Sequence, residues 1–136
     1  MEFDQARRFL SEHNRAVLHT YRGDGSPQLS PVLVTVDDEG DVLISTRETS
    51  MKVTNLERDP RASICAFTDG FFGPWVRVDG SASIERLPGA LESLVDYYRR
   101  VAGEHDDWAA YREAMQEERR VLVRITPQAA GPDASG

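Results

Sequence analysis

The alternation of apolar and polar residues along the chain predicts a domain built mainly of strands. Residues 75–84 alternate most clearly, with Val76, Val78 and Ile84 on one face and polar residues on the other. Similar runs, bounded by turns rich in Gly, Asp and Pro, predict further strands at 16–21, 27–36, 42–46, 61–67 and 118–126. Because short turns join the first three strands, we expect those three to form an antiparallel meander.

Helical periodicity occupies most of the remaining chain, and it predicts helices at 3–13, 51–58, 90–102 and 107–116. Strands that come in antiparallel runs, rather than alternating strictly with helices, argue against a doubly wound parallel sheet. We therefore expect a single, mainly β, α+β domain of barrel-like form over residues 1–126, with about six strands. Residues 127–136 are rich in Ala, Gly, Pro and Ser, which predicts a disordered tail.

Composition and charge narrow the range of partners. The 136 residues include 16 Lys and Arg against 23 Asp and Glu, for a net charge of −7. This balance argues against nucleic-acid binding, which needs a basic face, and against attraction to an anionic membrane surface. The chain has no apolar run of about 18 residues and no secretory signal at its start, so we expect a cytoplasmic protein.

The sequence offers little conventional catalytic or metal-binding chemistry. Cys65 is the only cysteine and is flanked by apolar residues, so we expect it in the core. His13, His19 and His105 have no metal-ligand spacing, and we expect His13 and His105 at the surface. The acidic turn at 37–41 fits a solvated hairpin better than a calcium loop. We therefore predict no metal site and no catalytic residue.

Segment 45–52 is a candidate anion site. It leads into a predicted helix start, where unpaired N–H groups attract phosphate or carboxylate, and Arg47 and Lys52 add positive charge. The alternative is an ordinary helix cap with a surface lysine, and by spacing alone that alternative is better supported. The same segment carries hydroxyl groups on Ser45, Thr46, Thr49 and Ser50.

Two strands carry polar or aromatic residues in unusual places. Pro27 and Pro31 interrupt ladder pairing, so their strand should lie at a sheet edge or carry a bulge. Gln28 and Ser30 share a face with valines, where they either orient a flat ligand or mark a solvent-exposed strand end. Trp75 falls on the polar face of its strand, which predicts a groove wall or an interface anchor.

The stretch 97–108 is rich in aromatic and charged residues, but its pattern favours a structural role. Its helix buries an apolar stripe. Arg99 and Arg100 lie in the last turns, where positive charge is favourable for the helix dipole. We therefore assign no site to this stretch.

Three segments together resemble the pyridoxamine-phosphate-oxidase-like superfamily of flavin and deazaflavin oxidoreductases. Residues 25–32 resemble its opening hairpin, and residues 52–63 resemble its phosphate-binding helix and following strand. Residues 98–122 are similar to one branch, the small enzymes that depend on the deazaflavin coenzyme F420. The resemblance implies a split β-barrel that forms a homodimer, with two cofactor sites at the subunit interface.

The resemblance also implies a set of cofactor-binding residues. Lys52 matches the lysine that holds the cofactor phosphate, Gln28 and Ser30 match the strand that borders the ring system, and Trp75 matches an aromatic position supplied across the dimer. Many relatives carry Arg where this chain has Ser50, and its loss should weaken phosphate binding unless Arg47 compensates. The positions that line the phosphate of the cofactor, and the linker that joins this phosphate to the ring system, are matched by Ser45, Thr46, Ser50 and Met51.

The function implied by this resemblance is F420-dependent reduction of an electron-poor small molecule, such as an activated alkene, an imine or a quinone-like acceptor. Because the hydride chemistry belongs to the cofactor, the protein needs no nucleophile of its own. An FMN-dependent oxidase or reductase on the same fold is the first alternative, since Lys52 would hold the phosphate of either cofactor. The second alternative is a carrier that binds F420 or another flat molecule without turnover.

Overall fold

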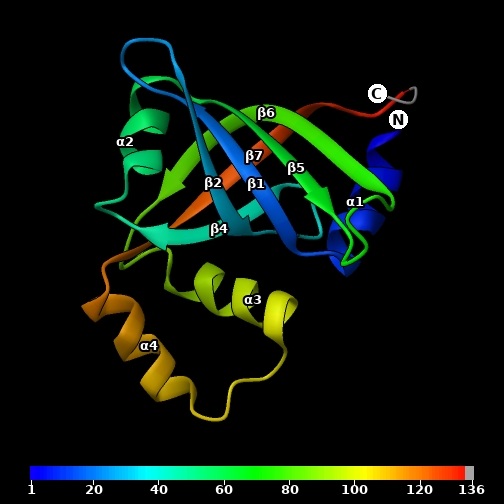
Figure 1. Cartoon of the computed structure of the whole chain (residues 1–136). Helices are drawn as coiled ribbons and strands as arrows, with labels where there is room; N and C mark the ends of the chain where they lie inside the picture. The colour runs from blue at the N-terminus through cyan, green and yellow to red at the C-terminus, as the bar shows by residue number, and fades with distance from the viewer. Residues whose placement is uncertain (134–136) are drawn as a thin grey trace.

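A computed structural model describes residues 1–133 of the chain (Figure 1). It contains four helices and seven strands in that range. The helices are α1 (Phe3–Glu12), α2 (Met51–Arg58), α3 (Leu91–Ala102) and α4 (Trp108–Glu117). The strands are β1 (Arg15–Tyr21), β2 (Pro27–Leu33), β3 (Thr35–Val36), β4 (Val42–Arg47), β5 (Arg61–Phe67), β6 (Trp75–Glu85) and β7 (Arg120–Gly131).

The seven strands form one antiparallel sheet in the order β2-β1-β5-β6-β7-β4-β3, and this sheet curls into an open barrel (Figure 1). The predicted α+β split-barrel class is therefore confirmed. The strand with Pro27 and Pro31 lies at the edge of the sheet, as the two prolines predict. A few helix and strand ends differ from the predicted bounds by one or two residues.

The predicted meander of the first three strands is only partly confirmed. The predicted strand at 27–36 is broken at Val34, so that its first part, β2, pairs with β1 and its last two residues, β3, pair with β4. The other edge of β4 pairs with β7. Val34 leaves the ladder because its N–H donates to the Asn14 carbonyl at 2.7 Å and its carbonyl accepts from Asn14 Nδ2 at 2.8 Å. The two pieces then lie at opposite ends of the strand order, which is how one segment of chain nearly closes the barrel.

The predicted boundary at residue 126 is also wrong, because β7 continues to Gly131. Its end pairs with β6, with Val78 opposite Ala130, and Ala130 is buried. A bulge at Asp79 and Gly80 brings the two strands so close that a Cβ on Gly80 would lie 2.2 Å from the Thr126 carbonyl oxygen. The end of β7 is rich in small residues, which by composition alone predicts disorder. It is ordered because the long strand β6, of eleven residues, provides a partner for it. The predicted disorder of residues 134–136 falls outside the described residues.

Two apolar clusters hold the elements together. One fills the barrel, where α1 inserts Ala6 and Leu10 against strand residues such as Ile64. The other lies outside the barrel, where α3 and α4 both pack on the outer faces of β4 and β7 through Leu43 and Leu122. The α3–α4 hairpin therefore projects beside β4 (Figure 1), and it forms a second layer on that side of the barrel.

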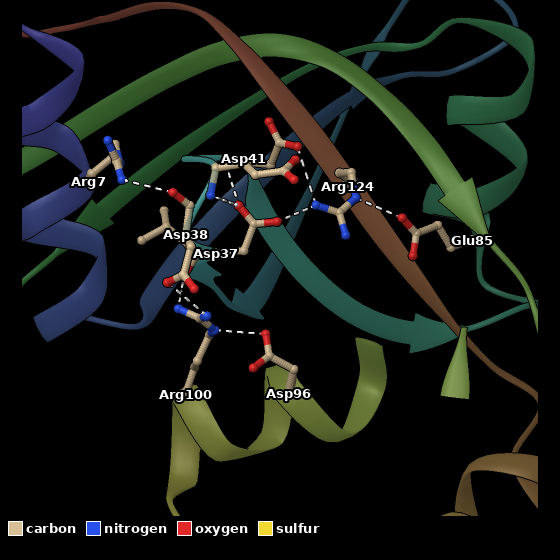
Figure 2. A network of polar contacts seen from close by, with 10 residues as sticks. Arg7, Asp37, Asp38, Asp41, Glu85, Asp96, Arg100 and Arg124 are labelled. Carbon is tan, nitrogen blue, oxygen red and sulfur yellow. Dashed lines mark hydrogen bonds and ion pairs between the residues drawn. The ribbon is translucent and has the colours of Figure 1, made fainter. Parts of the chain in front are cut away.

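Two minor expectations need correction. Cys65 is half-buried on the outer face of β5, because its neighbours Ile64 and Ala66 take the core positions of the alternating strand. The turn at 37–41 is not simply solvated, because Asp37 and Asp41 are largely buried against Arg124 (Figure 2). No helix within residues 1–133 is both long enough and apolar enough to span a membrane.

Candidate functional site

A cleft of about 710 Å³ lies between the barrel and the α3–α4 hairpin. Its barrel side comes from β2, β4, the start of α2 and the start of β7, and its other side comes from α3, α4 and the loop that joins them. The residues that line it are Pro31, Val32, Leu33, Ser45, Thr46, Lys52, Tyr97, Tyr98, His105, Ala110, Tyr111, Ala114, Met115, Glu118 and Arg120.

Lys52 is the principal charged group of this cleft. It is the only lysine in the chain, it is half-buried, and within residues 1–133 it forms no hydrogen bond or ion pair. Burial lowers the pKa of its ammonium group below the ordinary value, and the positive charge of Arg120 lowers the pKa further. Both effects disfavour the charged form, so a bound anion at this position would relieve them.

The start of α2 adds hydrogen-bond donors beside Lys52. Ser50 is the N-cap residue, but its side chain does not cap the helix and instead accepts from Thr46 Oγ1 at 3.3 Å. The backbone N–H groups of Met51 and Lys52 have no backbone acceptor in the described chain. Open N–H groups at a helix start favour anions, so they act in the same direction as the lysine.

Arg120 and Arg47 supply more positive charge than their shared partner Glu118 neutralises. Arg120 binds Glu118 Oε1 through Nη2 at 2.8 Å, and Arg47 Nη2 lies 3.6 Å from the same oxygen. Glu118 thus pairs with two arginines, and Lys52, whose pKa the charge of Arg120 lowers, adds a third positive charge to this part of a protein whose net charge is −7. The lysine is therefore no ordinary surface lysine, and the arrangement favours the anion-pocket interpretation of segment 45–52.

The helical side of the cleft is aromatic. Tyr97 donates its hydroxyl to the Leu33 carbonyl at 2.9 Å, and Tyr111 donates to the Leu94 carbonyl at 2.7 Å. Burial raises the pKa of Tyr111 to about 12, so its hydroxyl stays protonated at neutral pH. These bonds anchor α3 to the barrel and α4 to α3, and they fix two tyrosine rings along the cleft wall.

This aromatic wall was missed by the sequence prediction, which assigned residues 97–108 a structural role only. The helices do bury an apolar stripe, but Tyr97, Tyr98, His105 and Tyr111 also line the cleft. The available signal was the density of ring-bearing side chains across two consecutive helices and their loop. A single helix stripe has no need of so many rings.

The eight predicted cofactor-binding residues divide into two groups. Ser45, Thr46 and Lys52 line the cleft together, and Ser50 contacts Thr46 at its edge. Met51 is 56% exposed beside it. The others do not line the cleft of a single chain, and these are Gln28, Ser30 and Trp75.

The outlying residues have identifiable surroundings. Gln28 accepts a hydrogen bond from Asn55 Nδ2 at 3.4 Å, and buried Asn55 also donates to Thr20 Oγ1 at 3.1 Å, so Gln28 connects β2 to α2. Ser30 is half-buried on the same face of β2. Trp75 begins β6, where it pairs with Phe67. Their roles toward a cofactor remain predictions.

A comparison with known families agrees with this architecture. The sequence profile described as pyridoxamine 5'-phosphate oxidase matches residues 3–131, nearly the whole chain. The chain belongs to the pyridoxamine 5'-phosphate oxidase family. Oxidoreductases occur in this family, and its members bind flavins or F420.

Solved structures with the same fold cover almost all of this family member. The conserved hypothetical protein Rv2991 from Mycobacterium tuberculosis is 27% identical, with a TM-score of 0.78 over 100% of this chain and 92% of that chain. An F420 reductase is 19% identical, with a TM-score of 0.72 over 92% of this chain and 94% of that chain. The heme storage protein HutZ from Vibrio cholerae is 20% identical, with a TM-score of 0.71 over 96% and 94%.

The cleft of this family member fits a flat, anionic cofactor. Lys52 and the open N–H groups of α2 suit a phosphate, and the aromatic and aliphatic lining of β2, α3 and α4 suits a ring system. The volume of about 710 Å³ is within the ordinary range for small-molecule sites.

Proposed function

We propose that this protein is an F420-dependent oxidoreductase that transfers a hydride from reduced deazaflavin to an electron-poor small molecule. The observation that carries the proposal is Lys52, which is half-buried beside Arg120 and unpaired within the described residues, at the open start of α2 and inside the cleft. A phosphate bound there would neutralise charge that no carboxylate in the described chain neutralises.

Each part of the site has a proposed role. Lys52 and the N–H groups at the start of α2 hold the phosphate, and Ser45, Thr46 and Ser50 line it. Arg47, whose side chain is 61% exposed, compensates for the missing arginine at position 50. Gln28 and Ser30 border the ring system from β2, and Met51 lies by the linker. When bound, the reduced cofactor supplies the hydride, while the protein orients both reactants and excludes water.

We propose that the active form is a homodimer. The outer face of β2 exposes Leu29 and Leu33, which are 65% and 49% accessible, and the loop before β6 exposes Phe71 and Phe72. Figure 1 shows no described helix in front of β1, β2 and β5. A second copy would cover this apolar face and bring its Trp75 toward the cofactor site.

The test of the proposed function is a fluorescence titration with F420, run in parallel with a titration with FMN. We expect saturable binding of F420 at micromolar concentration and weaker binding of FMN. Tighter binding of FMN would assign the protein to the flavin-dependent alternative. Binding of neither cofactor would contradict the proposal.

Turnover separates the enzyme from a carrier. F420 binding with no oxidation of the reduced cofactor by any acceptor in a panel of enones, imines and quinones would favour the carrier alternative. The fold is compatible with the carrier alternative, because a protein described as a heme storage protein has a similar structure. We expect reduction of at least one acceptor class.

A further inference from the structure

His105 lies in the loop between α3 and α4, where the sequence predicts a surface residue without a role. The structure corrects this expectation, because His105 is half-buried and lines the cleft. It is the only histidine among the residues that line the cleft. Its imidazole therefore faces whatever the cleft contains, from the helical side.

The loop fixes which ring nitrogen of His105 carries the proton. The backbone N–H of Asp107 donates to His105 Nδ1 at 2.8 Å. A nitrogen that accepts a hydrogen bond has no proton, so in the neutral imidazole the proton is on Nε2. Nε2 has no hydrogen-bond partner among residues 1–133, which leaves it a free donor.

Neighbouring rings hold the imidazole in one orientation. The ring centroids of Tyr98, Tyr111 and Trp108 lie 5.0, 5.6 and 5.7 Å from that of His105. Tyr111 is itself fixed by its bond to the Leu94 carbonyl, and Trp108 Nε1 donates to Glu104 at 3.1 Å. A donor held in this way needs little reorganisation when charge develops beside it.

Most other polar side chains of the cleft already have a hydrogen-bond partner or belong to the anion site. The hydroxyl groups of Tyr97 and Tyr111 donate to backbone carbonyls. Lys52 and Arg120 belong to the anion end of the site. His105 and the Tyr98 hydroxyl remain as hydrogen-bond donors on the aromatic wall, and only for His105 does a hydrogen bond within the loop fix which atom is the donor.

We propose that His105 Nε2–H donates a hydrogen bond to the carbonyl oxygen of the acceptor, and that the acceptors are enones and quinones. The inference rests on the proposed function, because the hydride comes from a reduced deazaflavin. The hydride forms a C–H bond at the β-carbon of an enone, the C=C electron pair shifts toward the carbonyl, and the C=O pair moves onto oxygen. His105 keeps its proton and stabilises this enolate, and water then protonates the α-carbon to give the saturated ketone. In a quinone the hydride adds to a ring carbon in the same way, water protonates the enolate oxygen, and the added C–H tautomerises onto the second carbonyl oxygen to give the hydroquinone.

A matched pair of variants tests this role. His105→Asn keeps an acceptor for the Asp107 N–H but has no donor at the position of Nε2, whereas His105→Gln restores an N–H near that position. With menadione as acceptor, we expect His105→Asn to slow single-turnover hydride transfer about 10²- to 10³-fold, the effect of losing one such donor. His105→Gln should recover part of the rate, and His13→Asn serves as the control.

A second acceptor isolates the oxygen. N-methylacridinium takes a hydride at carbon without forming an oxyanion, so its rate should be the same in His105→Asn and in the wild type. Equal slowing of both acceptors would assign His105 a merely structural role, and no slowing of either would remove its role; both results overturn the inference. A rate lost in Tyr98→Phe and kept in His105→Asn would assign the donor to Tyr98 and also overturn it.

Nitrogen-15 NMR of the cofactor-free protein gives a readout that is independent of activity. The signals of His105 are those that disappear in His105→Asn, and we expect a protonated Nε2 and an unprotonated Nδ1. The opposite tautomer would overturn the inference and leave the proposed function intact. A wild type that binds cofactor and reduces N-methylacridinium but not menadione would also overturn the inference about His105 and leave the proposed function intact. A wild type that binds neither F420 nor FMN would overturn the inference and the proposed function together.

Discussion

At the level of single residues, Lys52 is the side chain on which the cofactor proposal depends. Its position at a helix start can be predicted from the sequence, because a polar segment precedes an amphipathic one. Its burial beside Arg120 and its lack of a carboxylate partner among residues 1–133 could not be predicted, since Arg120 comes from β7, 68 residues further along the chain. Distant neighbours of this kind distinguish an anion site from an ordinary cap.

Replacing Lys52 by alanine should weaken F420 binding by about 1.5–3 kcal/mol, or roughly 10- to 150-fold in the dissociation constant, because a charge-assisted hydrogen bond is lost. The change should not unfold the protein, since the ammonium group is already disfavoured by burial. Fluorescence titration measures the first effect and thermal unfolding the second.

The matched control is Arg22→Ala, which removes an exposed cation from the turn between β1 and β2. Arg22→Ala changes the net charge by the same amount and should leave F420 affinity unchanged. If Lys52→Ala and Arg22→Ala bind F420 equally well, the anion pocket is elsewhere. If both lose affinity equally, the effect is one of net charge alone.

At the level of elements, the turn between β3 and β4 is held by charge rather than by apolar packing. Arg124 of β7 binds Glu85 of β6 at 2.7 Å and Asp41 at 3.3 Å, and it also pairs with Asp37 (Figure 2). Burial raises the pKa of Asp37, but hydrogen bonds from Arg124 and from backbone N–H groups outweigh it and hold the pKa below 3.8. Local sequence shows an acidic turn, and only the barrel brings Arg124 to it.

The same turn is also tied to the helices that cover the barrel. Arg100 of α3 binds Asp38 at 3.1 Å and Asp96 at 2.8 Å, and Arg7 of α1 donates to the Asp38 carbonyl at 3.3 Å (Figure 2). The network therefore joins α1, the β3–β4 turn, α3 and β7. Because α3 forms one wall of the cleft, the network helps to set the position of that wall.

Arg124→Met should lower the free energy of unfolding by about 1–3 kcal/mol, because three carboxylates then share a partly buried space without their cation. Urea unfolding followed by circular dichroism measures this loss. Arg15→Met is the control, since its pair with Asp69 is exposed on both sides and contributes little. Equal stability of the two variants would show that the buried network does not hold the turn.

The same network should make stability depend on acid. The lowered pKa of Asp37 means that the unfolded chain binds its proton at a higher pH than the folded protein does. The contribution of Asp37 is therefore fully present above its ordinary value of 3.8 and is lost as the pH falls through its folded value. Wild-type stability should fall steeply below about pH 4, and Arg124→Met should flatten this slope.

At the level of the whole molecule, alternation and periodicity predict elements well but predict their partners poorly. The face that each strand buries is a local property, so β5 and β6 can be predicted almost residue by residue. The pairing of β4 with β7 and the break at Val34 depend on contacts with Asn14 and with a strand near the other end of the chain. The cleft forms at this crossing of distant segments, which is why half of it was missed.

The uncovered face of β1, β2 and β5 is a property of the assembled barrel. Leu29 on the edge strand is 65% exposed, and its cross-strand neighbour is His19. Light scattering should give the wild type a mass of two chains, twice 15.2 kDa, because covering this apolar face is favourable. Leu29→Glu should give a folded protein of about one chain mass, since the substituted side chain is already exposed in the single chain.

The dimer and the cofactor site should then fail together. If the partner's Trp75 completes the site, Leu29→Glu should weaken F420 binding although Leu29 does not line the cleft. Ser11→Glu adds the same charge at an exposed position of α1 and should leave both mass and affinity unchanged. A monomeric Leu29→Glu that binds F420 as tightly as the wild type would show that each chain holds a complete site, and Trp75 would then belong to the interface alone.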